Sequence, residues 1–269
     1  MKRIQLFEFE DQKWFGPSFR VALTKVLEVL DRVTGLHGVL AHELDQLISK
    51  TGQKKLFDYG SGSGGAMPET LKLLKAKYPD IQLELSDLFP DEKYAQIYND
   101  DKNDSITYNL KPVDASNANH KHDGIKTLIN SFHHLTPEVA TKVLKTAQDN
   151  NDTIIIYEMA ENKIPTIIWW LGLPIGLVLV SVMALLLTPF VKKLTLHQLF
   201  FTYLIPIIPL CYAWDGQASM PRIYTREDIQ ELLNCFERKE GYEWTIRPAL
   251  NTKNKPQGYV IIGQLTMHS

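Results

Sequence analysis

The sequence has few cysteines and no excess of either charge, and both properties exclude classes of protein. Cys211 and Cys235 are its only cysteines. Two cysteines, one of them in an apolar run, support neither a disulfide framework nor a zinc site, so we expect no metal. The 29 basic residues are balanced by 31 acidic ones, for a net charge of −2. A general nucleic-acid binder needs a basic face, so we expect no nucleic-acid partner.

The amino-terminal residues lack the features of an export signal. Residues 1–12, MKRIQLFEFEDQ, contain no apolar h-region, so we expect no secretory signal peptide and a catalytic part that stays in the cytoplasm. At 269 residues, the chain is long enough to bury one sizeable core with an appendage.

Glycine is concentrated in residues 54–65, KKLFDYGSGSGG. The short apolar run before Asp58 predicts a strand, and the glycines after it predict a turn that leads into a helix. A turn without Cβ atoms lets backbone N–H groups approach a ligand closely, and a helix N-terminus favours anionic groups. Ligands of open parallel sheets bind at the carboxyl ends of strands, so we expect a binding site at this turn.

Strand and helix patterns alternate from Lys54 onward. Apolar and β-branched runs predict five strands, at 55–58, 81–85, 106–113, 124–129 and 153–157. Helices are expected at 66–77, within 91–105 and at 136–149, and after an apolar insert we expect a helix at 225–236 and strands near 243–249 and 258–265. Repeated βα units favour an α/β fold with a Rossmann-like, doubly wound, mostly parallel sheet.

Two helices are predicted before the first strand, at 17–35 and 38–49. The first has apolar positions spaced by three and four residues: Phe19, Leu23, Val26, Leu27, Leu30 and Val33. His37, His42 and Glu43 suggest a metal cluster at first sight. Their spacing is not that of HExxH, and we interpret them as a solvated helix edge.

Residues 164–191 form a run of 28 residues without a formal charge, followed by Lys192 and Lys193. A second uncharged run, 194–214, contains two prolines. A bilayer core needs about 20 apolar residues of helix, so the first run is long enough and the second is marginal. We expect membrane association; the alternative is a helical lid or a dimer face of a soluble protein.

The chain after the insert returns to the same sheet, so the insert crosses a membrane twice or not at all. Prolines and glycines interrupt both runs, which suits a re-entrant or interfacial hairpin as well as a full span. We predict a helical hairpin at the cytoplasmic face of the membrane, embedded in one leaflet or crossing twice, with both termini cytoplasmic.

Residues 58–64, DYGSGSG, fit the D/E-x-G-x-G-x-G signature of the class I S-adenosylmethionine-dependent methyltransferases. The same glycines also satisfy G-x-G-x-x-G, so a dinucleotide-binding enzyme is an alternative. Asp87 after the second strand, Asp114-Ala115 after the third, and the segment 130–135, NSFHHL, after the fourth favour the methyltransferase resemblance. That family has a seven-stranded sheet ending in an antiparallel hairpin, for which 258–265 is the expected last strand.

The resemblance implies a cofactor, S-adenosylmethionine, and residues that hold it. The implied cofactor-binding residues are Asp58, Gly60, Ser61, Gly62, Asp87, Leu88, Asp114, Ala115 and Asn130. Asp87 is expected to accept from the ribose hydroxyls, with the alternative that it only caps the following turn. Asp114 is expected at the adenine amino group, with the alternative of a turn residue.

Candidate catalytic and substrate-binding residues come from two regions. His133 or His134 is a candidate general base, because imidazole titrates near neutral pH, and Glu158 follows the fifth strand at the rim of the expected pocket. The alternative for both histidines is packing at a helix entry. The candidate substrate-binding residues are Trp14, Asp215, Arg222 and Tyr224.

The segment after the insert resembles a narrower bacterial group of methyltransferases. Residues 214–225 match W-D-G-x-x-S-x-x-R-x-Y-T. We expect four parts: an N-terminal helical cap (1–53), the cofactor-binding core (54–163), the apolar hairpin (164–213) and the completion of the core (214–269). The expected function is methyl transfer to a hydrophobic or lipid-like acceptor. A non-catalytic membrane scaffold and an NAD(P)-dependent enzyme are the alternatives.

Overall fold

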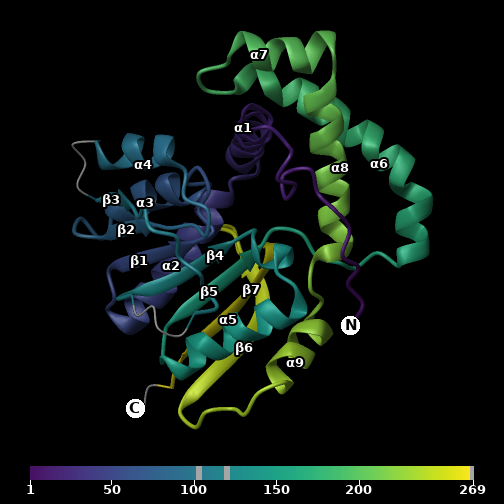
Figure 1. Cartoon of the computed structure of the whole chain (residues 1–269). Coiled ribbons are helices and arrows are strands. Elements are labelled where there is room, and N and C mark those ends of the chain that lie inside the picture. The colour runs from purple at the N-terminus through teal and green to yellow at the C-terminus, as the bar shows by residue number, and fades with distance from the viewer. Residues whose placement is uncertain (101–104, 118–121, 267–269) are drawn as a thin grey trace. The chain divides into compact units, whose positions relative to one another are not determined.

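The computed structural model describes residues 1–100, 105–117 and 122–266 and divides into two compact units. The sheet unit consists of residues 36–161 and 226–269 together with Met1, and the helical unit consists of residues 2–35 and 162–225. Figure 1 labels the helices and strands of both.

The sheet unit is built on seven strands in the order β3-β2-β1-β4-β5-β7-β6. The strands are β1 (Lys55–Tyr59), β2 (Gln82–Leu85), β3 (Ile106–Tyr108), β4 (Ile125–Ile129), β5 (Ile154–Glu158), β6 (Tyr242–Leu250) and β7 (Pro256–Leu265). The first five are parallel, whereas β7 is antiparallel to both β5 and β6. The predicted α/β fold with a doubly wound, mostly parallel seven-stranded sheet is confirmed.

The central strands are apolar because helices cover both faces of the sheet. Every residue of β5 is buried, as are four of the five residues of β4, the pattern typical of parallel strands in α/β proteins. The covering helices are α2 (Leu36–Thr51), α3 (Met67–Lys75), α4 (Glu92–Asn99), α5 (Pro137–Asp149) and α9 (Arg226–Asn234), with the 3₁₀ turn η1 (Phe132–His134).

Strand order reverses at β1, and this fixes where a ligand is expected. The chain moves from β1 toward β3 in one direction and from β4 to β5 in the other. Right-handed crossovers then place α3 and α4 on one face and α5 on the other. The carboxyl ends of β1 and β4 flank the switch point, where ligands of open α/β sheets bind, and the glycine turn follows β1 there.

The predicted elements are confirmed with two differences in extent. β3 ends at Tyr108, short of the predicted 106–113, although the Val113 amide still donates to the Asp87 carbonyl at 2.9 Å. α2 is longer than predicted, from Leu36 to Thr51. The loop predicted at 116–122 lies partly outside the described residues.

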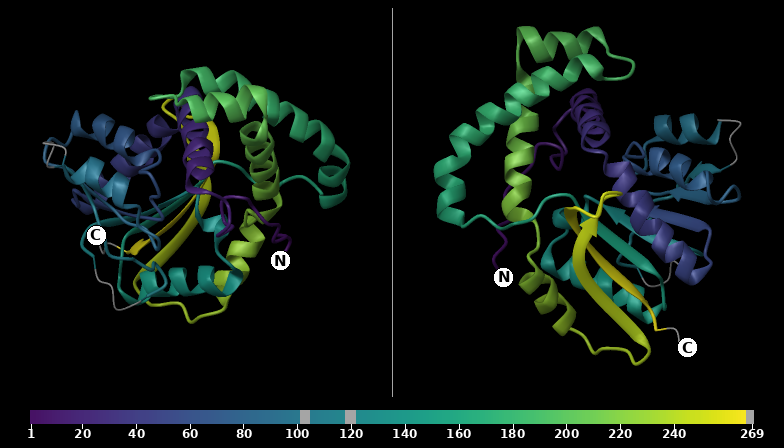
Figure 2. Two further views of the ribbon diagram at one scale, coloured as in Figure 1. Left: turned by 45° about the horizontal axis from the view of Figure 1, so that its top comes forward. Right: turned by 180° about the vertical axis from the view of Figure 1, so that it is seen from behind.

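The helical unit contains one amphipathic helix and the apolar hairpin. Its elements are α1 (Pro17–Thr34), α6 (Thr166–Leu187), η2 (Thr188–Phe190), α7 (Leu196–Leu199), the π-helical turn η3 (Phe200–Leu204) and α8 (Ile207–Arg222). Figure 2 shows the two arms of the hairpin, α6 and α8, and the turn that joins them. The division predicted from the sequence differs from the two units, because α2 packs with the sheet while residues 2–35 pack with the insert.

The apolar stripe of α1 packs against the hairpin. Ala22, Leu23, Val26 and Val29 lie in one buried cluster with residues of α6 and α8. Gly35 ends the helix in the left-handed conformation, with φ of 71°, where the missing Cβ removes the steric penalty. Val33 was expected on the apolar face and is instead exposed, because it lies outside the stripe that the hairpin covers.

The surface of α6 is almost entirely apolar, and one of its faces is exposed. By length and composition the 25 residues Thr166–Phe190 are enough to cross a membrane, and only 11% of their most apolar window is buried. The return arm is bent by 78° between Leu196–Leu204 and Ile207–Arg222. The arms pack closely at Gly176, where a Cβ would come within 2.6 Å of the Gln217 side chain.

Glu43 is not at a solvated helix edge, as predicted, but fully buried. Both of its carboxylate oxygens accept from the guanidinium of Arg247 on β6, at 2.9 and 2.5 Å, and Oε1 also accepts from the Leu250 amide. This bidentate pair ties α2 to the edge strand. His42, also predicted to lie on that edge, lies within hydrogen-bond distance of Gln46 at 3.0 Å.

We expect Glu43→Ala to destabilise the sheet unit strongly, because it leaves the Leu250 amide and the Arg247 guanidinium without their acceptor. Breaking a buried pair costs about 3–5 kcal/mol, which corresponds to a fall in Tm of roughly 6–20 °C for a domain of this size. Thermal unfolding of the full chain in detergent, followed by circular dichroism, measures it.

Asp45→Asn on the same helix is the matched control, because Asp45 pairs with exposed Lys77 and exposed pairs contribute little. Equal losses in Tm for the two variants would contradict the role given to Glu43.

Candidate functional site

The glycine turn after β1 has backbone conformations that only glycine adopts freely. Gly60 and Gly62 have φ of 65° and 51°, in the left-handed region that L side chains rarely occupy. A Cβ on Gly62 would meet no atom within 4 Å, whereas one on Gly60 would lie 3.3 Å from the Ser131 hydroxyl. Two phenols hold the outer part of the turn: Tyr108 donates to the Gly62 carbonyl and Tyr98 to the Ser63 carbonyl, both at 2.9 Å.

Asp58, predicted to bind the cofactor, lies buried at the end of β1. Its Oδ2 accepts from the Ser61 hydroxyl at 2.6 Å and its Oδ1 from the Thr127 hydroxyl of β4 at 2.5 Å. Burial raises the pKa of Asp58 to about 7, although both hydroxyl hydrogen bonds act in the opposite direction. The carboxyl group is therefore partly protonated near neutral pH, and a positive charge placed beside it would favour its ionised form.

Asp87, expected at the ribose, closes the turn from the end of β2. Its Oδ2 accepts from the Gly62 amide and its Oδ1 from the Phe89 amide, both at 2.9 Å. The capping alternative is thus present in the structure. Each carboxylate oxygen accepts more than one hydrogen bond, so the ribose role stays a prediction. Leu88 beside it is exposed.

Asp114, expected at the adenine, forms a local turn after β3. Its Oδ1 accepts from both the amide and the hydroxyl of Ser116, at 2.8 and 2.7 Å. Ala115 is half-buried in the same turn. The amide of Val113, the residue before Asp114, donates to the Asp87 carbonyl. The structure therefore brings the ends of β2 and β3 together, and the adenine role stays a prediction.

Asn130 and Ser131 follow β4 opposite the glycine turn. Asn130 has φ of 49°, and its Oδ1 accepts from the Met159 amide at 2.8 Å. A non-glycine residue in this region is uncommon and marks a constrained position. The buried Ser131 hydroxyl has no hydrogen-bond partner among the described residues, and it is the side chain closest to Gly60. An orphaned hydroxyl beside a glycine cradle fits a site for a polar ligand.

His133 and Glu158 form a buried pair at the ends of β4 and β5. Oε1 of Glu158 accepts from the His133 amide at 3.0 Å, and Oε2 lies 2.8 Å from Nδ1 of the His133 ring. A carboxylate at Nδ1 favours the tautomer with its proton there, which leaves Nε2 as the acceptor. His134 lies beside it, with ring centroids 4.3 Å apart. Of the predicted catalytic residues, His133 and Glu158 are thus directly paired.

Sequence reasoning did not select Thr127 or Ser131 as site residues. Ser131 lies within the NSFHHL segment already noted, so its position was a usable signal. Thr127 is the one hydroxyl residue in β4, and its sequence position gives no signal. The pairing of β4 with β1 places it opposite Asp58, and only this pairing identifies it as a site residue.

The predicted substrate-binding residues all lie in the helical unit, where three of them hold the amino-terminal segment. Arg222 is 1% exposed and pairs with Glu8 at 3.1 Å and Asp11 at 2.7 Å. Asp215 accepts from the Phe9 and Glu10 amides at 2.6 and 3.2 Å. Their substrate role stays a prediction, and the structure adds a structural role that the sequence did not suggest.

Tyr224 and Trp14 differ in exposure. Tyr224 is buried, and the Arg3 guanidinium lies 4.4 Å above its ring. Trp14 is 70% exposed and touches the rings of Phe9 and Phe15 edge-on. The Trp14 side chain therefore does not belong to the buried core.

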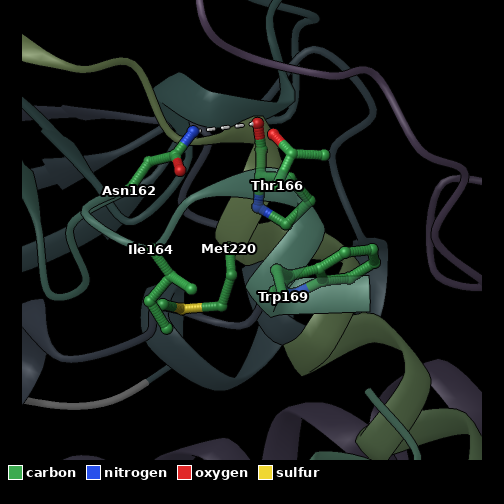
Figure 3. Close-up of a pocket in the computed structure, with 6 residues that line it drawn as sticks. Asn162, Ile164, Thr166, Trp169 and Met220 are labelled. Atoms are coloured by element: carbon green, nitrogen blue, oxygen red, sulfur yellow. Dashed lines mark hydrogen bonds between the residues drawn. The ribbon is translucent and has the colours of Figure 1, made fainter. Parts of the chain in front are cut away.

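Figure 3 shows the residues that line a small cavity in the helical unit. Its volume is about 10 Å³, and it is lined by Asn162, Ile164, Thr166, Trp169, Met220 and Pro221. Nδ2 of the Asn162 side chain donates to the Pro221 carbonyl at 3.3 Å. The volume is enough for roughly one water molecule, so this cavity does not serve as a substrate site.

Comparison with known proteins finds matches only in structure. No protein-family model matches the chain, and no curated protein matches it. The structure of the plantazolicin methyltransferase BpumL in complex with SAH matches 93% of this chain and 98% of its own, with a TM-score of 0.51 and 11% identity. TnmH matches 96% of this chain and 60% of its own, with a TM-score of 0.52 and 13% identity. The chain therefore has the fold of the class I methyltransferases.

Proposed function

We propose that the chain is an S-adenosylmethionine-dependent methyltransferase that works at the cytoplasmic face of a membrane on a hydrophobic or lipid-like acceptor. The observation that carries the proposal is the glycine turn at the switch point of a sheet in the order β3-β2-β1-β4-β5-β7-β6. BpumL, a structural neighbour, is a methyltransferase in complex with SAH, which supports the same cofactor here.

The glycine pattern fits both a methyltransferase and a dinucleotide-binding enzyme, but the strand order of the sheet favours the methyltransferase. The Rossmann dinucleotide fold has six strands in the order 3-2-1-4-5-6. Here the strand beside β5 is β7, which runs antiparallel and arrives from the carboxyl-terminal hairpin. A non-catalytic scaffold would retain this sheet, but it would not require the paired His133 and Glu158.

The residues around the turn suit the groups of the proposed cofactor. Asp58 would hold the amino group of its methionine part, and the glycine amides would hold the carboxylate. Asp87 and Asp114 would accept from the ribose and the adenine, and the Asn130 carbonyl would line the sulfonium end. When bound, S-adenosylmethionine supplies an electrophilic methyl group, and the protein must present the acceptor in line with it.

His133 is the proposed general base, and Glu158 is the residue that positions it. Because the carboxylate holds the proton on Nδ1, Nε2 is the ring nitrogen that would take the proton of an acceptor hydroxyl or amine. Both oxygens of Glu158 contact His133, so the ring is fixed in one orientation. His134 is the alternative base.

The hairpin supports the membrane part of the proposal. α6 presents exposed apolar side chains along its length, including Ile167, Leu171, Ile175, Val178, Leu179 and Leu186. Exposed apolar patches of this extent on soluble monomers mark binding surfaces for proteins or membranes. An acceptor dissolved in the membrane would explain why a methyltransferase carries such a surface.

We expect the full chain to bind S-adenosylhomocysteine about tenfold more tightly at pH 8 than at pH 6. In the free protein Asp58 is protonated below its pKa of about 7, whereas a bound ammonium group favours its ionised form. Binding therefore releases a proton from Asp58, and the affinity falls as the pH is lowered. Calorimetric titration across this range measures the affinity. Asp58→Asn should lose most of the pH dependence.

Asp87→Ala should weaken binding at every pH, because the Gly62 amide and the ligand lose an acceptor. Asp80→Ala is the control, since Asp80 is an exposed carboxylate paired with Lys54. Absence of binding heat for the unmodified chain, or thermal stabilisation by NADPH and not by S-adenosylhomocysteine, would reject the cofactor assignment.

We expect Glu158→Gln to lower methyl transfer by roughly 10²-fold, the scale of general-base catalysis, with little change in cofactor affinity. The amide keeps the size of the side chain but loses the charge that stabilises His133 as it takes a proton. Transfer is measured as a +14 Da product in host lipid extract. His133→Gln should match this loss, whereas His134→Gln should retain activity; the opposite order would make His134 the base.

We expect Ile175→Asp with Leu179→Asp to release the chain from membranes while cofactor binding persists. Both residues are about two-thirds exposed, at 67% and 64%, so the substitutions remove little packing. Co-flotation with liposomes measures the association. Leu73→Asp with Phe89→Asp in the sheet unit, also exposed, is the control and should float normally. An unmodified chain that does not float would refute the membrane proposal.

A further inference from the structure

We infer that the apolar hairpin enters one leaflet of a phospholipid membrane without crossing it, and that its tip, residues 190–195, lies at the headgroups on the side of the sheet unit. This inference rests on the proposed membrane association and specifies its geometry. It chooses between the two arrangements that the sequence leaves open.

α1 is bound along the tip of the hairpin. The Arg32 guanidinium donates to the Phe190 carbonyl at 3.0 Å, and the Lys25 ammonium donates to the Lys193 carbonyl at 3.3 Å. Nearer the N-terminus of α1, the ring of Phe19 lies 5.1 Å from that of Phe201. Contacts thus continue over most of α1, and wherever the tip lies, α1 lies there too.

α1 is not a helix that a membrane interior would accept. Its 18 residues include five charged ones: Arg20, Lys25, Glu28, Asp31 and Arg32. Its apolar stripe is already buried against the hairpin, so apart from the exposed Val33 the remaining surface that it offers is mainly polar. Charged side chains are expensive in hydrocarbon, and α1 therefore belongs at the headgroups or in water.

The covalent chain decides on which side. Arg32 lies four residues before Leu36, the first residue of α2 and part of the buried core of the sheet unit. Four residues of extended chain reach at most about 14 Å, and the hydrocarbon core of a bilayer is about 30 Å thick. A tip that stays bound to Arg32 cannot reach the far side while Leu36 remains in a folded unit on the near side.

The shape of the hairpin also fits a single leaflet. The return arm bends by 78° after Leu204 and includes a polar second half, residues 214–222, so it offers no straight apolar span to match α6. The exposed face of α6 suits acyl chains. Lys25, Arg32, Lys192 and Lys193 near the tip carry the positive charge that complements lipid phosphates. Interfacial helices with this division of surface lie within one face of a membrane.

Labelling of the tip by a charged, membrane-impermeant maleimide tests the inference in the full chain. Lys192→Cys, combined with Cys235→Ser to remove the exposed native thiol, places one accessible thiol at the tip. The chain is expressed in bacteria, and labelling is compared between spheroplasts and inside-out vesicles. The single variant Cys235→Ser reports any labelling of the buried Cys211. In the chain with Cys235 intact, labelling of Cys235 reports the side of the membrane on which the sheet unit lies.

We expect the tip thiol to be labelled in inside-out vesicles as completely as Cys235, and less than a tenth as much in spheroplasts. Labelling in spheroplasts, or only after detergent, would overturn the single-leaflet inference while the proposed membrane association stands. Absence of the chain from washed vesicles would overturn both, and flotation distinguishes that outcome. Arg32→Ala should leave cofactor binding unchanged; if it moves the labelling to spheroplasts, the Arg32 contact is what prevents crossing.

Discussion

The candidate site depends on the two hydrogen bonds that the buried Asp58 carboxyl group accepts, from Ser61 and from Thr127. This carboxyl group joins three segments that are distant in the sequence: the end of β1, the glycine turn through Ser61, and β4 through Thr127. Without this link the turn keeps the Asp87 carboxylate, which accepts from the Gly62 amide, and the phenols of Tyr98 and Tyr108 at its outer part. A buried acid is costly when ionised, and here two hydroxyl donors offset part of that cost. Because its ionised form is only partly stabilised, the carboxyl group would lose its proton when a positively charged group binds beside it.

The fold was predictable because its signals are local. Apolar runs of strand length, helical spacing and a glycine turn after Asp58 were sufficient for the order of elements. The antiparallel end of the sheet at 258–265 was instead implied by the resemblance to the methyltransferases. Glu43 shows the limit: its neighbours in sequence suggested a solvent-exposed edge, and its partner Arg247 lies about 200 residues away. A long-range ion pair leaves no local pattern, so a buried charge and an exposed one look alike in sequence.

The candidate site divides in the same way. Asp58, Asp87 and Glu158 could be selected as candidates because they lie at the ends of strands that meet at one edge of the sheet. Their partners could not be, because Thr127 and Ser131 gain their roles only from strand register and turn conformation. For Arg222 the sequence indicated a polar contact but not its partners. The structure shows Glu8 and Asp11, which hold the amino-terminal segment to α8.

The position of the insert has a consequence for biosynthesis. β5 pairs with β7 through residues more than a hundred positions apart, such as Ile154 and Gly263, and the whole hairpin is made between them. During synthesis β5 is therefore an open edge of aliphatic residues, and unpaired edges of this kind recruit other chains. The apolar hairpin leaves the ribosome in the same interval. Early capture of the hairpin by a membrane would hold nascent chains apart until the last two strands close the sheet.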